Sequence, residues 1–451
     1  MMTDTSIARA LAAELDQRLC PGRILTGPDY DNSRRIWNGA IDHQPALIVR
    51  PHTPDEVQTA VLAAQHHGVP LSVRGGGHDW AGRSLRSEGL VIDLSAMNRV
   101  AVDPQTQLAT VGGGATTGGV IKAAQAHRLS AATGTVGAVG MAGLTLGGGY
   151  GPMIGRYGLA LDNLMGANVV LADGRCVTAT PSREPELYWA LRGGGGNFGV
   201  VTSLSVQLHP VANVLAGLIR YPWHQAAHAW TQLDDILAAA PDQLTVQSGI
   251  LCGPEDGPTL FLSPVWCGDL AAGETALEPL LRLGTPLSAQ VEPMPYAQML
   301  DLFDAVVVPG RHYSMRTRSV ARYTAQVISA LLDAGHHQTS TVSAVSVHHF
   351  HGAATRVPLE ATAFGIRQPH YMIEILAAWE PDDAPARHLA WADTVAAELV
   401  PHALPGGYAN LLGPTDDEQI THAFGANTNR LRAAKNYFDP NGVFSAIPLP
   451  T

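Results

Sequence analysis

Hydrophobic and polar positions near the start of the chain follow the order strand, helix, strand. The apolar run 46–50 ("ALIVR") has the length of a short buried strand. A capping box formed by Thr53 and Glu56 predicts the start of a helix, and Gly68 predicts its end. A second strand is predicted over 70–74 ("PLSVR"), and three glycines follow it directly. A β-α-β unit that ends in a glycine loop is a frequent site for ligand phosphates.

The pattern predicts further short elements as far as residue 208. In chain order these are strands at 90–94, 99–102 and 107–111, a helix at 117–128, a hairpin at 167–180 with an Asp-Gly turn, a helix at 184–192 and a β-rich run at 200–208. The uncharged, glycine-rich segment 133–151 is expected to be a long loop without secondary structure. Loops of this length inside a compact domain are usually functional.

After His209-Pro210 the glycine density falls and a second pattern begins. It predicts strands near 215–220, 243–251, 258–266, 341–347 and 370–379, and helices near 223–239, 272–283, 318–334 and 386–400. A helix over 428–438 is expected to pack back on the first part of the chain. We therefore predict an α+β protein with a β-α-β-containing domain over 1–210. A second domain over 211–411 is built on one large antiparallel sheet backed by helices, and a C-terminal segment, 412–451, returns to the first domain.

Composition and charge exclude several classes of partner. The net charge of −11 disfavours a nucleic-acid or anionic-membrane partner, because both require basic patches. We find no run of about 20 apolar residues and no signal peptide, so we expect a cytoplasmic protein without a membrane span. The four cysteines have no metal-ligand spacing, and we predict neither a disulfide framework nor a metal site.

Three glycine-rich loops carry the first candidate chemistry. The third contains Gly194, Gly196 and Gly199 in the dinucleotide pattern G-x-G-x-x-G, but a helix precedes it and a strand follows, the reverse of the NAD-binding order. The other two loops are 74–82 and 133–151. Three such loops in one domain favour a backbone-lined groove for a nucleotide-like cofactor. Three tight turns without a ligand are the alternative.

Several motifs together resemble one known family. They are "VRGGGHDWAGRS" (73–84), "GLTLGGGYG" (143–151), "YGLALDNL" (157–164), "ELYWALRGGGGNFGVVT" (186–202), "YANLL" (408–412) and "RLRAAKNYFDPNGVF" (430–444). The set is similar to the FAD-linked oxidases of the vanillyl-alcohol oxidase and p-cresol methylhydroxylase fold, in their berberine bridge enzyme-like branch. The resemblance implies a two-domain FAD-binding fold and an oxidoreductase with a small-molecule substrate.

The resemblance also implies how the flavin is held. His78 stands where the family has the histidine that is bonded to the flavin 8α-methyl carbon. Val136 stands where some members have a second, cysteine link, so a single link is expected. Val139 stands where the family controls oxygen access, which favours an oxidase over a dehydrogenase, although apolar packing would also explain this valine.

The remaining cofactor positions follow from the same motifs. Those that the resemblance places near FAD are Arg74, Gly75, Gly76, Gly77, Asp79, Gly134, Gly140, Gly143, Leu146, Gly147, Asn163, Gly199, Val201 and Asn410.

Two residues are candidates for the catalytic base. Tyr408 in "YAN" matches a family tyrosine that often faces the substrate, although a packed aromatic is nearly as good an explanation. Glu374 is second: strand alternation places it on one face with Met372 and Leu376, and this carboxylate either enters a pocket or pairs with a residue such as Arg367.

The histidines of "VHHFHG" (347–352) could suggest a metal, because His349 and His351 share a strand face. They have no acidic or cysteine partner nearby, so we expect solvent-exposed or structural histidines.

The resulting hypothesis is an oxidase in which FAD takes a hydride at N5 from a small alcohol, amine, phenol or sugar, and O2 reoxidises the flavin to give hydrogen peroxide. The alternatives are a dehydrogenase with another electron acceptor and a non-catalytic flavin- or ligand-binding protein.

Overall fold

The predicted β-α-β unit is present near the start of the chain. The computed structural model describes residues 5–253, 257–303 and 306–450. Three parallel strands pair in the order β1-β3-β2, with bounds β1 (Leu47–Val49), β2 (Leu71–Arg74) and β3 (Leu90–Asp93). Helix α3 (Pro54–His66) begins where Thr53 Oγ1 accepts a hydrogen bond from the Glu56 amide at 3.2 Å. The Glu56 carboxylate accepts from the amide of His52 at 2.6 Å.

A second sheet carries the glycine loops. It runs in the order β4-β5-β9-β7-β8, with β6 paired to β9, and its neighbours are antiparallel. Its strands are β4 (Val100–Asp103), β5 (Leu108–Gly112), β6 (Ser130–Ala131), β7 (Leu164–Val170), β8 (Cys176–Ala179) and β9 (Val200–His209). The helices around it are α4 (Thr117–Gln125) and α7 (Pro185–Leu191). The predicted Asp-Gly turn joins β7 to β8, with Gly174 at φ +82°.

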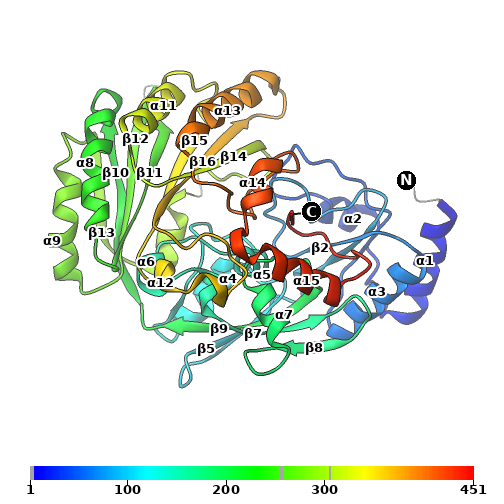
Figure 1. Ribbon diagram of the computed structural model, residues 1–451. Helices are drawn as coiled ribbons and strands as arrows, with labels where there is room; N and C mark the ends of the chain where they lie inside the picture. Colours follow the sequence, from blue (N-terminus) through cyan, green and yellow to red (C-terminus); the bar gives the residue numbers. More distant parts are fainter. Residues whose placement is uncertain (1–4, 254–256, 304–305, 451) are drawn as a thin grey trace.

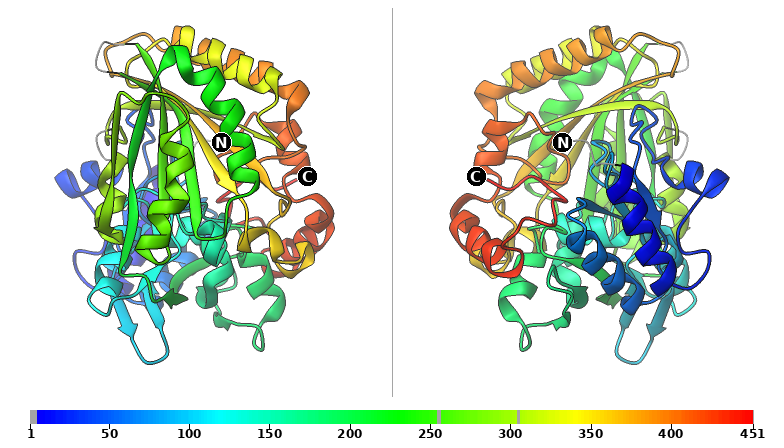
Figure 2. Two further views of the ribbon diagram at one scale, coloured as in Figure 1. Left: turned by 90° about the vertical axis from the view of Figure 1, so that its left-hand side faces the viewer. Right: turned by 90° about the vertical axis from the view of Figure 1, so that its right-hand side faces the viewer.

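The third sheet has seven antiparallel strands in the order β13-β10-β12-β11-β15-β16-β14. They are β10 (Asn213–Pro222), β11 (Leu244–Cys252), β12 (Pro258–Trp266), β13 (Ser288–Pro295), β14 (His312–Val320), β15 (Ala344–Phe350) and β16 (His370–Trp379). Helices α8 (Ala226–Ala238), α9 (Leu270–Leu281), α11 (Ala325–His336) and α13 (Ala386–Leu399) cover its outer face, as Figures 1 and 2 show. The other face is left for the site. The predicted α+β class with a large antiparallel sheet is confirmed.

Three sequence predictions were wrong, two in the large sheet and one in the second glycine-rich segment. The sheet is wider than expected, because β13 and β14 were missed. The helix predicted over 318–334 begins only at Ala325, since β14 pairs residue by residue with β16 as far as Val320. The segment 133–151 is also not structureless, because it contains the seven-residue helix α5 (Met141–Gly147). The glycines in this helix have low helix propensity, so the sequence pattern did not indicate it.

The C-terminal segment lies against the glycine-loop part of the chain. Helix α15 (Thr428–Phe438) packs on α7 (Figure 1). The Asn197 side chain accepts from the amide of Ala446 at 2.7 Å and donates to the Ile447 carbonyl at 3.0 Å. The other helices are α1 (Thr5–Arg18), α2 (Gly27–Ser33), α6 (Ile154–Tyr157), α10 (Tyr296–Met299), α12 (Ala353–Arg356) and α14 (Asp417–His422). None of the helices in the described ranges has the length and apolar character of a membrane span. The domain boundaries at 210 and 411 stay a prediction.

Candidate active site

A cavity of about 350 Å³ lies between the glycine loops and the inner face of the large sheet. We call its two sides the glycine wall (lining residues from 75–84, 134–146 and 195–201) and the sheet wall (Met315, His348, Met372, Glu374 and Leu376). The cavity brings together most of the residues that the sequence nominated. These are Gly75, Gly76, Gly77, His78, Asp79, Gly134, Val139, Gly140, Gly143, Leu146, Gly199, Val201, Glu374, Tyr408 and Asn410. Val136 lines the cavity as well.

The glycine wall is made by backbone segments in contact. A Cβ atom on Gly76 would lie 2.4 Å from the Gly140 nitrogen, so no side chain fits between these two loops. Gly77 has φ +69°, a left-handed conformation that glycine adopts without strain. The first and second glycine loops therefore meet because both lack side chains at the contact.

His78 is the central residue of the glycine wall. Its ring stacks on Trp37 with 4.3 Å between centroids, and Trp37 stacks in turn on Tyr313 at 3.9 Å. Burial lowers the pKa of His78 to about 4, so the imidazole is neutral at pH 7. Its Nε2 atom is buried and has no hydrogen-bond partner among the described residues. Buried polar atoms are normally paired, so this one calls for an explanation.

Three nominated residues lie outside the cavity lining. The Arg74 guanidinium pairs with Asp93 at 3.2 Å, at the end of β2. Gly147 packs against Asn410, whose Oδ1 would lie 2.0 Å from an added Cβ. Asn163 donates to the carbonyl of Leu159 at 2.8 Å and bonds His209 Nε2 at 2.6 Å. Each of these groups is used in holding the loops rather than in facing the cavity.

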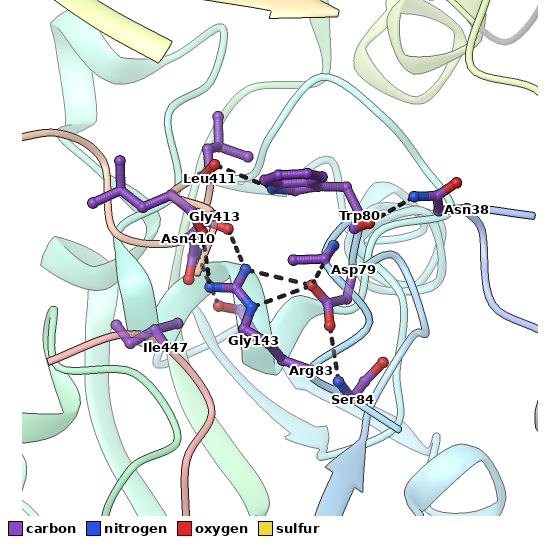
Figure 3. Close-up of polar contacts among 12 residues, drawn as sticks. Asn38, Asp79, Trp80, Arg83, Ser84, Gly143, Asn410, Leu411, Gly413 and Ile447 are labelled. Carbon is purple, nitrogen blue, oxygen red and sulfur yellow. Dashed lines mark hydrogen bonds and ion pairs between the residues drawn. The ribbon is translucent and has the colours of Figure 1, made fainter. Parts of the chain in front are cut away.

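A cluster of polar contacts, which we call the clasp, joins the loop after His78 to the Tyr408 segment (Figure 3). Arg83 Nη2 donates to the Asn410 carbonyl at 2.7 Å, and Nη1 donates to the Leu412 carbonyl at 3.3 Å. Trp80 Nε1 donates to the carbonyl between them, Leu411, at 3.1 Å. Asp79 was nominated as a cofactor residue, but its carboxylate accepts from the Ser84 amide at 2.8 Å and lies 3.4 Å from the Arg83 guanidinium.

The sheet wall follows the predicted alternation along β16. Met372, Glu374 and Leu376 line the cavity, while Ile373 and Ile375 join the core beneath the helices. Glu374 does not pair with Arg367, whose guanidinium binds the carboxylate of Asp162 at 2.8 and 2.9 Å. The described partner of Glu374 is instead His348, with 3.2 Å between Oε2 and Nε2.

Tyr408 lies buried at the junction of the two walls. Its hydroxyl accepts hydrogen bonds from the Gly149 amide at 2.9 Å and from Asn410 Nδ2 at 3.0 Å. Burial, partly opposed by these two hydrogen bonds, raises the pKa of Tyr408 to about 12. The ring of Tyr150 packs beside it at 4.9 Å, and the Tyr150 hydroxyl bonds His370 Nε2 at 2.8 Å.

Sequence reasoning missed Trp37, Trp80, Arg83 and His348. Trp80 and Arg83 lie inside the motif 73–84. A tryptophan and an arginine within five residues of His78 could have indicated a role at the site. His348 belongs to "VHHFHG", in which His349 and His351 share the opposite strand face and gave the sequence signal. His349 and His351 are buried and stacked at 3.9 Å, as expected of structural histidines.

The comparisons with known proteins agree with this geometry. The family described as "FAD binding domain" matches residues 45–180, and the family described as "Berberine and berberine like" matches 408–447. The FAD-linked oxidoreductase aurO of Gibberella zeae is 31% identical over 431 residues, which cover 94% of this chain and 84% of that protein. The (R)-6-hydroxynicotine oxidase of Paenarthrobacter nicotinovorans is 34% identical over 276 residues, which are 60% of each protein.

Solved structures show the same fold. The 6-hydroxy-D-nicotine oxidase of Arthrobacter nicotinovorans superposes with a TM-score of 0.87 at 27% identity, over 96% of this chain and 98% of that one. Xylooligosaccharide oxidase of Myceliophthora thermophila superposes with a TM-score of 0.84 at 25% identity, over 98% and 99%. The chain is therefore an FAD-linked oxidoreductase. It belongs to the berberine bridge enzyme-like family.

The residues present fit an FAD cofactor. Glycines from three loops bring backbone groups to the cavity surface, which suits an extended ligand with phosphates. Nε2 of His78, which has no hydrogen-bond partner in the described part of the chain, belongs to a neutral ring on the same wall. The described charged groups of this wall, Asp79 and Arg83, pair with each other and leave the glycine amides free of competing carboxylates.

Proposed function

We propose that the chain is an oxidase of small organic molecules whose FAD is joined to His78. The observation that carries the proposal is the state of His78: a buried, neutral imidazole, with Nε2 unpartnered among the described residues, on the wall made by three glycine loops. A neutral imidazole keeps a nitrogen lone pair for a bond to carbon, which a protonated ring lacks. Val136 offers no second link, so the attachment is single.

The chemistry divides between the cofactor and the sheet wall. When bound at the glycine wall, FAD would supply the hydride acceptor, at N5, and would return the electrons to O2 to give hydrogen peroxide. Glu374 takes the proton of the substrate, because it is a carboxylate on the cavity surface that His348 holds in place at 3.2 Å. Tyr408, with a pKa of about 12, is a poorer base at neutral pH and serves as a hydrogen-bonding residue. This reverses the order expected from the sequence.

The lining favours one kind of substrate. Trp37, Met315, Met372 and Leu376 present apolar surface to the cavity. An oligosaccharide would leave many hydroxyl groups without partners there, and each unpaired polar group lowers affinity. We therefore propose a small, mainly apolar alcohol, amine or phenol. Val139 lines the cavity at the position associated with oxygen access, which supports O2 as the electron acceptor.

The first test is the visible spectrum of the purified protein, followed by acid precipitation. We expect flavin absorbance and a yellow pellet, and a His78→Ala variant whose pellet is colourless. A colourless wild-type pellet would overturn the covalent link. A protein that neither contains nor takes up FAD would leave a ligand-binding protein as the better explanation.

The second test addresses the base and the acceptor. Benzyl alcohol, benzylamine, 4-hydroxybenzyl alcohol and xylobiose are offered as probes, and flavin reduction and oxygen uptake are recorded. We expect Glu374→Gln to slow flavin reduction about 100-fold or more without loss of FAD, the usual contribution of a general base. Glu398→Gln, at an exposed position of α13, is the matched control. Reduction without oxygen uptake would identify a dehydrogenase instead.

A further inference from the structure

The clasp connects two parts of the cavity that are 331 residues apart along the chain, measured from Trp80 to Leu411. Its acceptors are three consecutive main-chain carbonyls, those of residues 410, 411 and 412. Three adjacent carbonyls fixed by side-chain donors leave the main chain of this segment little freedom to rotate. The clasp therefore sets the orientation of the segment as well as its position.

The guanidinium of Arg83 is itself held from the opposite side. The Asp79 carboxylate lies 3.4 Å from Nε and Nη2, a distance at which the attraction is mainly electrostatic. The same carboxylate is fixed by the amides of Ala81 at 3.2 Å and Ser84 at 2.8 Å. The Arg83 side chain is 21% exposed. The donor fork is thus pre-organised by the loop that begins at His78.

The fixed carbonyls determine where the side chain of Asn410 points. Its Nδ2 donates to the Gly143 carbonyl at 3.2 Å and to the Tyr408 hydroxyl at 3.0 Å. The Tyr408 hydroxyl accepts in addition from the Gly149 amide at 2.9 Å. Arg83 is therefore linked to Tyr408 through Asn410, whose main-chain carbonyl accepts from Arg83 and whose side-chain amide donates to the Tyr408 hydroxyl. Figure 3 shows Arg83 reaching the main chain beside Asn410.

We infer that Arg83 is a positioning residue that aims Asn410 and Tyr408 into the cavity by fixing the carbonyls of residues 410 and 412. The inference rests on the proposed function only in taking these two side chains as neighbours of the reacting molecule. A guanidinium is required because its planar fork reaches two carbonyls at once, whereas a lysine ammonium is a single compact donor. Arg83→Lys is therefore not a conservative change at this position.

Amide hydrogen exchange of the protein as purified tests the positioning without any substrate. We expect Arg83→Gln to raise exchange at least several-fold in peptides covering 408–413 and at the Gly149 amide, which bonds the Tyr408 hydroxyl. Peptides from β16 should stay unchanged. Trp80→Phe removes one donor and keeps an aromatic side chain, so it should give a smaller effect in the same peptides. Arg99→Gln, at an exposed position outside the cavity lining, is the control. Unchanged exchange over 408–413 in Arg83→Gln would overturn the inference.

Chemical rescue separates positioning from general stability. With the probe that best reduces the flavin, we expect Arg83→Gly to lower the rate of flavin reduction about 10-fold while it keeps its FAD. Millimolar guanidinium chloride should restore part of that rate, and the same concentration of urea should not. A rate that equals the wild-type rate, or that guanidinium leaves unchanged, would contradict a positioning role. If the wild-type protein itself lacks FAD, the proposed function fails, while the exchange experiment still decides the role of Arg83.

Discussion

The two walls of the cavity are built by different means. The glycine wall brings backbone to the cavity surface at the glycines of three loops, and two of these loops approach so closely that a Cβ on Gly76 would lie 2.4 Å from the Gly140 nitrogen. The sheet wall is made of side chains from β14, β15 and β16, with the Glu374–His348 pair among methionine and leucine. For the proposed oxidase, the comparison teaches that close contact between loops depends on the absence of side chains, whereas the proposed substrate side depends on the identity of its side chains.

The largest effect is expected where a carbon atom is added to the glycine wall. Gly76→Ala should give a protein without FAD, because two backbone segments cannot both keep their places and accommodate the methyl group. FAD content from the absorbance spectrum is the measurement. Gly137→Ala is the matched control, since this glycine of the second loop lies outside the cavity lining and a Cβ there meets only the Gly118 Cα, at 3.8 Å. A yellow Gly76→Ala protein with normal FAD content would show that the loop contact is not needed for binding.

A smaller effect is expected from substitutions in the sheet wall. They should slow flavin reduction and leave the FAD content unchanged. His348→Leu removes the hydrogen bond that holds the Glu374 carboxylate, so we expect flavin reduction to slow about 10-fold, equal to about 1.4 kcal/mol of the barrier. His348→Gln keeps a donor and should recover most of the rate. FAD content should not change in either variant. A loss of FAD, or equal rates for leucine and glutamine, would contradict the separation of the two walls.

The smallest effect concerns stability and involves buried histidines outside the cavity lining. Burial lowers the pKa of His209, His351 and His370 to about 4, against 6.5 for an ordinary histidine. Between pH 6.5 and 4 the unfolded chain binds protons that the folded chain does not. The contribution of these histidines to the free energy of unfolding is therefore fully present above pH 6.5, and it is lost as the pH falls toward 4.

Urea unfolding at pH 7.5, 6, 5 and 4.5 measures this dependence. Each buried histidine contributes at most about 3 kcal/mol to the loss. His351→Gln should reduce the slope of the free energy of unfolding against pH by the contribution of one proton. His127→Gln, at an exposed position, should leave the slope unchanged. A stability that is flat over this range would contradict the buried neutral state of the three rings.

Local signals in the sequence predicted the helix that begins at Thr53 and the turn at Gly174, because each is fixed by contacts within a few residues. The family resemblance supplied the nominated glycines, and most of them line the cavity. The strand β14 was missed for the opposite reason. Its place in the sheet depends on pairing with β16, more than 50 residues later, and nothing local in 312–320 required it.

By itself, the sequence determined the α+β class, the FAD-linked family, the three glycine loops and the face of β16 that carries Glu374. Hydrophobic periodicity and turn residues act over short stretches of the chain, so they can be recognised in the sequence alone. Only the tertiary structure decided that Glu374 pairs with His348, that Arg74 and Asn163 lie outside the cavity lining, and that Arg83 holds the Tyr408 segment. These contacts join strands and loops that are far apart along the chain, and burial and hydrogen bonding choose among many possible partners only when the chain has folded.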